Sequence, residues 1–158
     1  ALKRLGGTPL PPSVIIIGKI VATLILVAGQ TVILGGIAAL MGWRPELGGI
    51  VVGAVLLALG SAAFSSMGLL LGGTLRAEIV LGLANLIWFV LIGAAGLAVG
   101  VAELPSELTE VLVVVPSYAL TEALLVADSG GFPALAALVL LAWTAICGGF
   151  AVRHFSFT

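Results

Sequence analysis

The chain has 158 residues, of which 61% are hydrophobic and 8% are charged, and its net charge is −1. A soluble domain carries roughly 25% charged residues, so six basic and seven acidic side chains cannot cover the surface of a water-soluble globule of this length. The composition therefore excludes a water-soluble enzyme or binding module. The absence of a basic stripe also argues against a nucleic-acid partner, and a single cysteine, Cys147, excludes an internal disulfide bond.

Four uncharged stretches are long enough to cross the hydrocarbon core of a membrane, which takes about 20 helical residues. They are Ile20–Trp43, Leu47–Leu75, Ile79–Ala102 and Ser129–Val152. Each stretch is apolar on all sides, as a helix surrounded by lipid and by other helices must be. With their flanking residues they predict transmembrane helices at 13–43, 47–75, 77–102 and 129–152, and hence an all-α membrane protein.

The segment 103–128, between the third and fourth predicted spans, holds a fifth apolar stretch, Val111–Thr121, that is too short to cross a membrane. It carries Pro105, Glu107 and Glu110 before an apolar run that Pro116 interrupts. We expect one or two short helices here, lying outside the membrane or re-entering it.

The basic residues are distributed unequally between the two predicted sides of the membrane. Five of them share one side with the chain ends 1–12 and 153–158, namely Lys3, Arg4, Lys19, Arg76 and Arg153, and Arg44 lies on the other side. Basic residues concentrate in cytoplasmic loops. Both termini are therefore expected in the cytoplasm, and 103–128 is expected outside it.

Three glycine pairs have the spacing that allows two helices to pack closely. They are Gly49 with Gly53, Gly68 with Gly72, and Gly96 with Gly100. With 22 glycines in the chain, some such pairs arise by chance. The pattern alone does not distinguish the pairs that pack from the others.

Two amide side chains, Gln30 and Asn85, fall near the middle of predicted spans. An amide at this depth needs a hydrogen-bond partner or a water-filled cavity. Either the two residues line a substrate route, or each ties two helices together with a bond worth about 1 kcal/mol. Both interpretations remain open from the sequence.

The sequence shows no motif of catalytic residues. The sequence has no glycine-rich nucleotide loop, no paired histidines on a helix, and no cluster of metal ligands. An intramembrane enzyme would need ionisable groups at depth, and none of the four uncharged stretches supplies a charge. We therefore expect no catalytic residue and no metal site.

The amino-terminal segment is short, basic and amphipathic, and prolines separate it from the first span. The run LKRLGGTPLPPSVIIIGKI, from Leu2 to Ile20, resembles the segment that follows the second membrane helix of ABC-2 type transporter permeases, a family that includes the daunorubicin-resistance exporters. The run Ser66–Glu78 is similar to the family's GLLLGxLxRxE turn, and Ala84–Ile87 to its ANLI. Residues 103–105 and 115–124 resemble its outward LP…P…LxEAL region.

The resemblance implies six membrane helices, of which this chain carries the last four. It implies a permease that pairs with a second, identical or different, permease subunit and contacts a separate ATPase, on which ATP and Mg²⁺ bind, so that no cofactor is expected on this chain. The predicted contact with the ATPase consists of Leu2, Lys3, Arg4, Leu5, Thr8, Pro9 and Leu10. The expected location is a bacterial plasma membrane, among membrane lipids.

The sequence does not define the transported compound. An apolar route with few amides suits drug-like or lipid-like amphiphiles better than ions or sugars, and Gln30, Asn85 and Tyr118 are the candidate residues along it. The alternative function is a free-standing small membrane protein with four helices, such as a channel or an assembly factor, with no ATPase partner. A channel would be expected to show a polar or charged ring.

Overall fold

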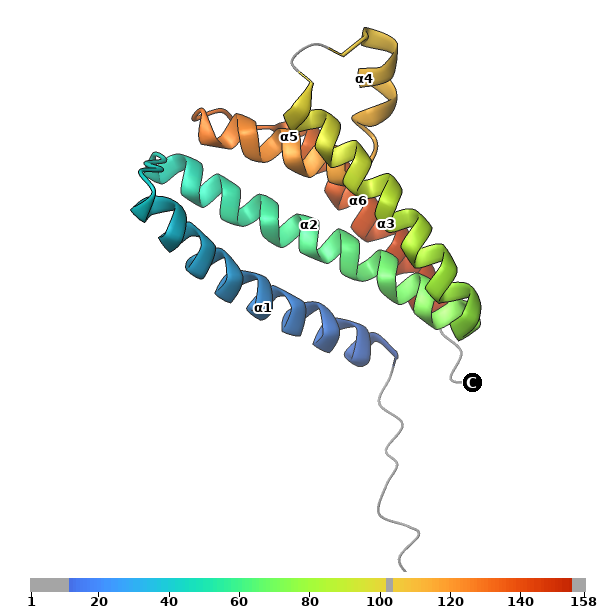
Figure 1. Ribbon diagram of the computed structural model, residues 1–158. Coiled ribbons are helices and arrows are strands. Elements are labelled where there is room, and N and C mark those ends of the chain that lie inside the picture. Colours follow the sequence, from blue (N-terminus) through green and yellow to red (C-terminus); the bar gives the residue numbers. More distant parts are fainter. Residues whose placement is uncertain (1–11, 102–103, 155–158) are drawn as a thin grey trace, which may run out of the picture.

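The computed structural model describes residues 12–101 and 104–154, and over these ranges every regular element is a helix. The six helices are α1 (Pro12–Leu40), α2 (Leu47–Thr74), α3 (Ala77–Gly100), α4 (Ser106–Leu112), α5 (Pro116–Asp128) and α6 (Ala134–His154). Figure 1 shows their arrangement. The predicted all-α fold class is confirmed. The predicted ATPase contact, Leu2 to Leu10, lies outside the described residues.

The four long helices α1, α2, α3 and α6 each contain an apolar span of 20 to 28 residues, long enough to cross a membrane. They correspond to the four predicted spans. The last helix begins later than the uncharged stretch that suggested it, because a tight turn comes first: Gly130 has a φ of +81°, and Pro133 precedes the helix. The left-handed φ favours glycine, and proline is well tolerated beside a helix start.

The helix ends gather at two opposite ends of the bundle. The start of α1, the tight turn between α2 and α3, and the end of α6 lie together, whereas the α1–α2 loop and the α5–α6 turn lie at the far end (Figure 1). We call the second of these the loop end. Arg76 and Arg153 therefore share one end of the bundle, and Arg44 lies at the loop end.

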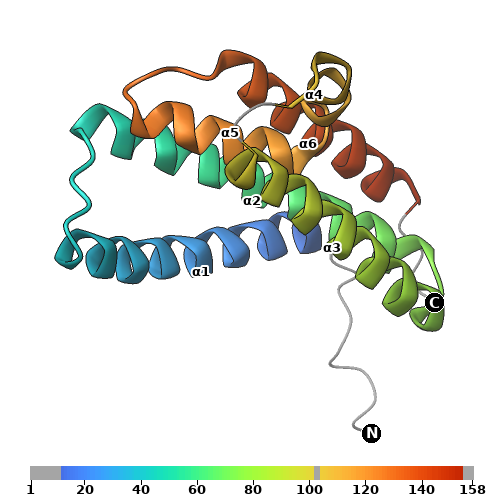
Figure 2. The same ribbon diagram turned by 45° about the horizontal axis from the view of Figure 1, so that its top comes forward.

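The centre of the fold is α2, which packs against α1 on one side and against α5 and α6 on the other (Figure 2). Close approach to α5 depends on glycine. A Cβ on Gly49 would lie 2.6 Å from the carbonyl oxygen of Ala127, and one on Gly60 would lie 2.6 Å from Cδ2 of Leu120. The pair Gly49 and Gly53 thus marks a real helix contact.

The other two glycine pairs behave differently. A Cβ added at Gly68, Gly72, Gly96 or Gly100 would meet no described atom within 4 Å beyond its own helix and neighbours. Within the described part of the chain, these four glycines therefore make no close helix contact.

Helices α4 and α5 form a bent pair, with an angle of 104° between them. The start of α5 lies beside the middle of α3, where the Ser117 hydroxyl reaches the Leu91 carbonyl. Leu91 is nine residues from the end of α3 at Gly100, or about 14 Å along the helix. Helix α3 runs away from the end that holds Arg76 and α6 runs back toward it, so the chain leaves α3 and enters α6 on the same side of the bundle. The bent pair between them has the form of a re-entrant loop, and we call it the re-entrant pair.

The least enclosed helix is α1. None of its residues whose side chains are described is buried, and one of its contacts with the rest of the fold is Ile20, which packs beside Leu69 of α2 and Ala151 of α6. Figure 2 shows α1 alone on its side of α2. The helix is therefore held mainly by α2.

Candidate functional site

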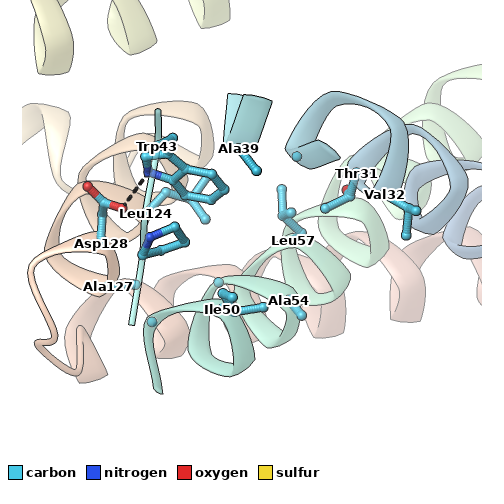
Figure 3. Close-up of a pocket in the computed structure, with 14 residues that line it drawn as sticks. Thr31, Val32, Ala39, Trp43, Ile50, Ala54, Leu57, Leu124, Ala127 and Asp128 are labelled. Carbon is cyan, nitrogen blue, oxygen red and sulfur yellow. Dashed lines mark hydrogen bonds between the residues drawn. The ribbon is translucent and has the colours of Figure 1, made fainter. Parts of the chain in front are cut away.

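A cavity of about 540 Å³ lies between the halves of α1 and α2 nearest the loop end. We call it the α1–α2 wedge (Figure 3). Its lining residues are Thr31, Val32, Gly35, Ala39, Trp43, Pro45, Gly49, Ile50, Gly53, Ala54, Leu57, Leu124, Ala127 and Asp128. The volume falls within the roughly 300–1,000 Å³ of ordinary small-molecule sites.

Small side chains create this space. Gly35 and Ala39 on α1 face Gly53 and Ala54 on α2, and glycine and alanine are too small to fill the gap between two helices. The wedge is not sealed, because Val32 lines it and is still 75% exposed. It therefore opens along the side of the bundle, where a membrane would supply hydrocarbon.

The loop end of the wedge is closed by a hydrogen bond. The indole Nε1 of Trp43 donates to Oδ1 of Asp128 over 2.9 Å, and Figure 3 shows the carboxylate beside the nitrogen of the ring. The bond joins the α1–α2 loop to the last residue of α5. A tryptophan with an apolar ring and one polar atom suits the boundary between the membrane and water.

Two further hydrogen bonds fix the position of the bend between α4 and α5. The indole Nε1 of Trp143 donates to the carbonyl oxygen of Val114 over 2.9 Å, and the hydroxyl of Ser117 donates to the carbonyl oxygen of Leu91 over 2.7 Å. An irregular backbone inside a membrane must find partners for its polar groups within the protein. These two bonds therefore fix the re-entrant pair between α3 and α6.

Two further cavities flank the region where α2 and α3 diverge below the start of α5. Their volumes are about 440 Å³ and 520 Å³, and Met67, Leu71, Ile87 and Leu91 line both of them. Both linings are almost entirely apolar. The few polar side chains are Ser117 in the smaller cavity, and Trp143 and Cys147 in the larger one. These cavities could hold an apolar ligand, but they provide few side chains that could form hydrogen bonds with it.

The three predicted substrate-route residues lie on three different helices. The side chains of Gln30 on α1 and Asn85 on α3 are exposed, and within the described part of the chain neither forms a hydrogen bond. Tyr118 on α5 is only 6% exposed and packs with Ala94 and Leu112. The structure does not bring the three together, and none of them lines the α1–α2 wedge.

A family model described as ABC-2 type transporter matches residues 2–128, which is 127 of the 158 residues. The chain belongs to the ABC-2 type transporter family. Searches among curated proteins and among solved structures found no match. The matched range includes the predicted ATPase contact and helices α1 to α5.

Membership settles the general role of this ABC-2 chain. It is the membrane-spanning permease subunit of a transporter, a multi-pass membrane protein that is not itself catalytic. Permeases of this family generally dimerise and work with an ABC ATPase.

Sequence reasoning missed the residues that close the wedge and hold the break. Trp43 and Asp128 are 85 positions apart, and no sequence spacing connects them. A signal for Trp43 was its place at the end of an apolar stretch beside Arg44, where interfacial tryptophans occur. Ser117 and Trp143 had no comparable signal.

Proposed function

We propose that the chain is a permease subunit of an ATP-driven exporter of hydrophobic or amphiphilic compounds, drug-like or lipid-like. It pairs with a second permease subunit, identical or different, and couples to separate ATPase subunits that carry ATP and Mg²⁺. The observation that carries this proposal is the family match, which starts at residue 2 and so includes the amino-terminal segment.

The proposed orientation places both termini in the cytoplasm of a bacterium, with the chain in the plasma membrane. The positions of Arg76 and Arg153 at one end of the bundle and of Arg44 at the other support it, since basic residues concentrate on the cytoplasmic side. The loop end then faces outward, and the re-entrant pair enters from outside.

Coupling is proposed to run through the segment that leads into α1. Lys3 and Arg4 would meet an acidic rim on the ATPase, while Leu2, Leu5 and Leu10 would fill an apolar groove beside it. The neighbouring prolines stiffen the joint, because they fix φ. Because α1 is held mainly by α2, a push at its start can tilt it without unpacking α2, α5 and α6.

The substrate route is proposed to pass the exposed amides Gln30 and Asn85. A polar group facing hydrocarbon without a partner is costly, by several kcal/mol on alkane-transfer scales, about 4–8. Both amides therefore favour a protein neighbour or a water-filled route over lipid. Tyr118 is left out of this proposal, because its side chain is packed inside the fold.

The alternative, a free-standing membrane protein with four helices, explains the helices equally well. It does not explain the match of residues 2–11, which precede the first described helix. The family match therefore counts against it.

The test reverses the charge of the coupling segment in the full transporter. The double substitution Lys3→Glu and Arg4→Glu is expected to abolish efflux of daunorubicin, a fluorescent amphiphile, from cells or vesicles, with ATP hydrolysis by the partner retained and membrane insertion normal. The control exchanges the two charges, Lys3→Arg with Arg4→Lys, and should keep efflux. Unchanged efflux in the charge-reversed variant would refute the assignment of the coupling segment.

The same preparation tests the partner assignment. Native mass spectrometry of the protein, extracted gently from its own membranes, should show the permease with a soluble nucleotide-binding protein. A chain that is found alone, or only with itself, would overturn the proposal in favour of the free-standing protein.

A further inference from the structure

The α1–α2 wedge is an apolar space beside the membrane that the described chain leaves unfilled. Its volume is about 540 Å³. A methylene group occupies about as much space as the ~30 Å³ share of one water molecule in the liquid, so the wedge holds a chain of roughly 18 methylenes. This is the size of one lipid acyl chain, and the exposed Val32 shows that such a chain can enter from the side.

One charged residue, Asp128, lines the loop end of the wedge, and two more, Arg44 and Glu46, belong to the α1–α2 loop beside it. Arg44 lies between Trp43 and Pro45, both of which line the cavity. Asp128 lines the cavity and accepts the indole hydrogen bond. The carboxylate of Glu46 lies close by, with its Oε2 3.7 Å from where a Cβ of Gly130 would be.

This arrangement places one positive and two negative side chains near one membrane interface. A headgroup that carries both a phosphate and an amine complements such a set, since the phosphate can meet Arg44 and the amine can meet Asp128 or Glu46. A purely anionic headgroup would meet two carboxylates for one guanidinium. The charges therefore select a zwitterionic amine headgroup over an anionic one.

We propose that the α1–α2 wedge binds one acyl chain of a zwitterionic aminophospholipid, with the headgroup held by Arg44, Asp128 and Glu46. The lipid fills the gap between two helices that contact each other poorly near the loop end. It is a resident of the fold and not the transported compound, so the proposal does not depend on the proposed function.

Trp43 gives the headgroup a structural connection to the re-entrant pair. Its indole joins the wedge to the end of α5 through Asp128. A bound lipid would hold α1, α2 and α5 in one arrangement. Removal of the lipid would leave α1 with the hydrogen bond of Trp43 and its contacts to α2 and the end of α6.

The test measures retained lipid on the full transporter with its partner subunits. The assembly is reconstituted in vesicles of phosphatidylethanolamine, or of phosphatidylglycerol, and then examined by native mass spectrometry. We expect at least one tightly retained phosphatidylethanolamine per permease chain. Phosphatidylglycerol is expected to be retained about tenfold more weakly, in line with the loss of one charge-assisted contact.

Two matched pairs of variants locate the site. Ala54→Phe fills the wedge and should remove the retained lipid, whereas Ala142→Phe, at an exposed position of α6 outside the wedge, should not. Arg44→Gln should weaken retention of phosphatidylethanolamine about tenfold, and Arg76→Gln, in the turn at the opposite end, should leave it unchanged. The arginine variants alter no packed residue, so they remain informative if Ala54→Phe fails to assemble.

Each contrary result overturns a defined part of the proposal. Lipid that survives both Ala54→Phe and Arg44→Gln would place it elsewhere on the protein. A wild-type assembly that retains no lipid would mean that another protein segment fills the wedge. Equal retention of the two lipids would show that the headgroup assignment is wrong.

Discussion

The contact between α2 and α5 can be tested by adding a single methyl group. In the substitution Gly49→Ala, the new Cβ would lie 2.6 Å from the carbonyl oxygen of Ala127 and 3.5 Å from its carbonyl carbon. Ordinary contacts begin near 3.4 Å, and the clashing atom belongs to the backbone, so α5 must move. Gly48→Ala is the matched control, because a Cβ on the neighbouring Gly48 meets nothing within 4 Å.

The magnitude follows from two opposing effects. Alanine in place of glycine favours a helix by up to about 1 kcal/mol in both variants. Overpacking at a tight contact costs about 1–3 kcal/mol, and only Gly49→Ala incurs it. We therefore expect Gly48→Ala to be neutral or stabilising, and Gly49→Ala to be less stable than Gly48→Ala by about 1–3 kcal/mol, or several degrees in Tm.

Cys147 provides the assay. It is the only cysteine of the chain and is buried, at 4% exposure, so a thiol-reactive fluorogenic dye labels it as the protein unfolds on heating. Labelling of the purified transporter in detergent gives a midpoint temperature for each variant. Equal midpoints for Gly48→Ala and Gly49→Ala would refute the close approach of α2 to α5, as would a higher midpoint for Gly49→Ala.

Two further predictions concern the hydrogen bonds that hold the re-entrant pair. Ser117→Ala removes the donor to the Leu91 carbonyl and should lower stability by about 1 kcal/mol. The control Ser61→Ala, which breaks a bond only within α2, should change the midpoint little, and equal shifts for the two would argue against the α3–α5 link. Trp143→Phe leaves the Val114 carbonyl without its donor and should cost about 1–3 kcal/mol. It is measured by size-exclusion chromatography after heating, and a wild-type profile would contradict the assigned role of the indole.

The four spans could be predicted because the membrane imposes a simple requirement. About 20 uncharged helical residues are needed to cross it, and the chain places charged residues between such stretches, as at Arg44 and Arg76. One or two short helices were expected in 103–128 for the same reason, since its apolar stretch Val111–Thr121 is too short for a fifth span and is interrupted by Pro116. Local composition determines these features.

The contacts between helices could not be predicted in this way. The pairs Gly49 with Gly53 and Gly68 with Gly72 have the same spacing on the same helix, yet only the first meets a neighbour. The difference lies in where α5 crosses α2, which no local pattern encodes. The wedge is equally hidden, because it depends on how α1 diverges from α2 and on a bond between Trp43 and Asp128.

The polar groups divide into those that the fold satisfies itself and those that it does not. Among the described residues, no buried side-chain nitrogen or oxygen lacks a hydrogen-bond partner, and Ser117 even bonds across helices. The mid-span amides Gln30 and Asn85 are instead exposed, and they lie on α1 and α3, the two long helices with the fewest buried residues. Lipid cannot supply hydrogen bonds to an exposed amide. We therefore expect the faces of α1 and α3 that carry these amides to meet water or protein in the assembled transporter. Assembly should then cover exposed faces of α1 and α3, whereas α2 and α6 contain more of the buried residues of the subunit.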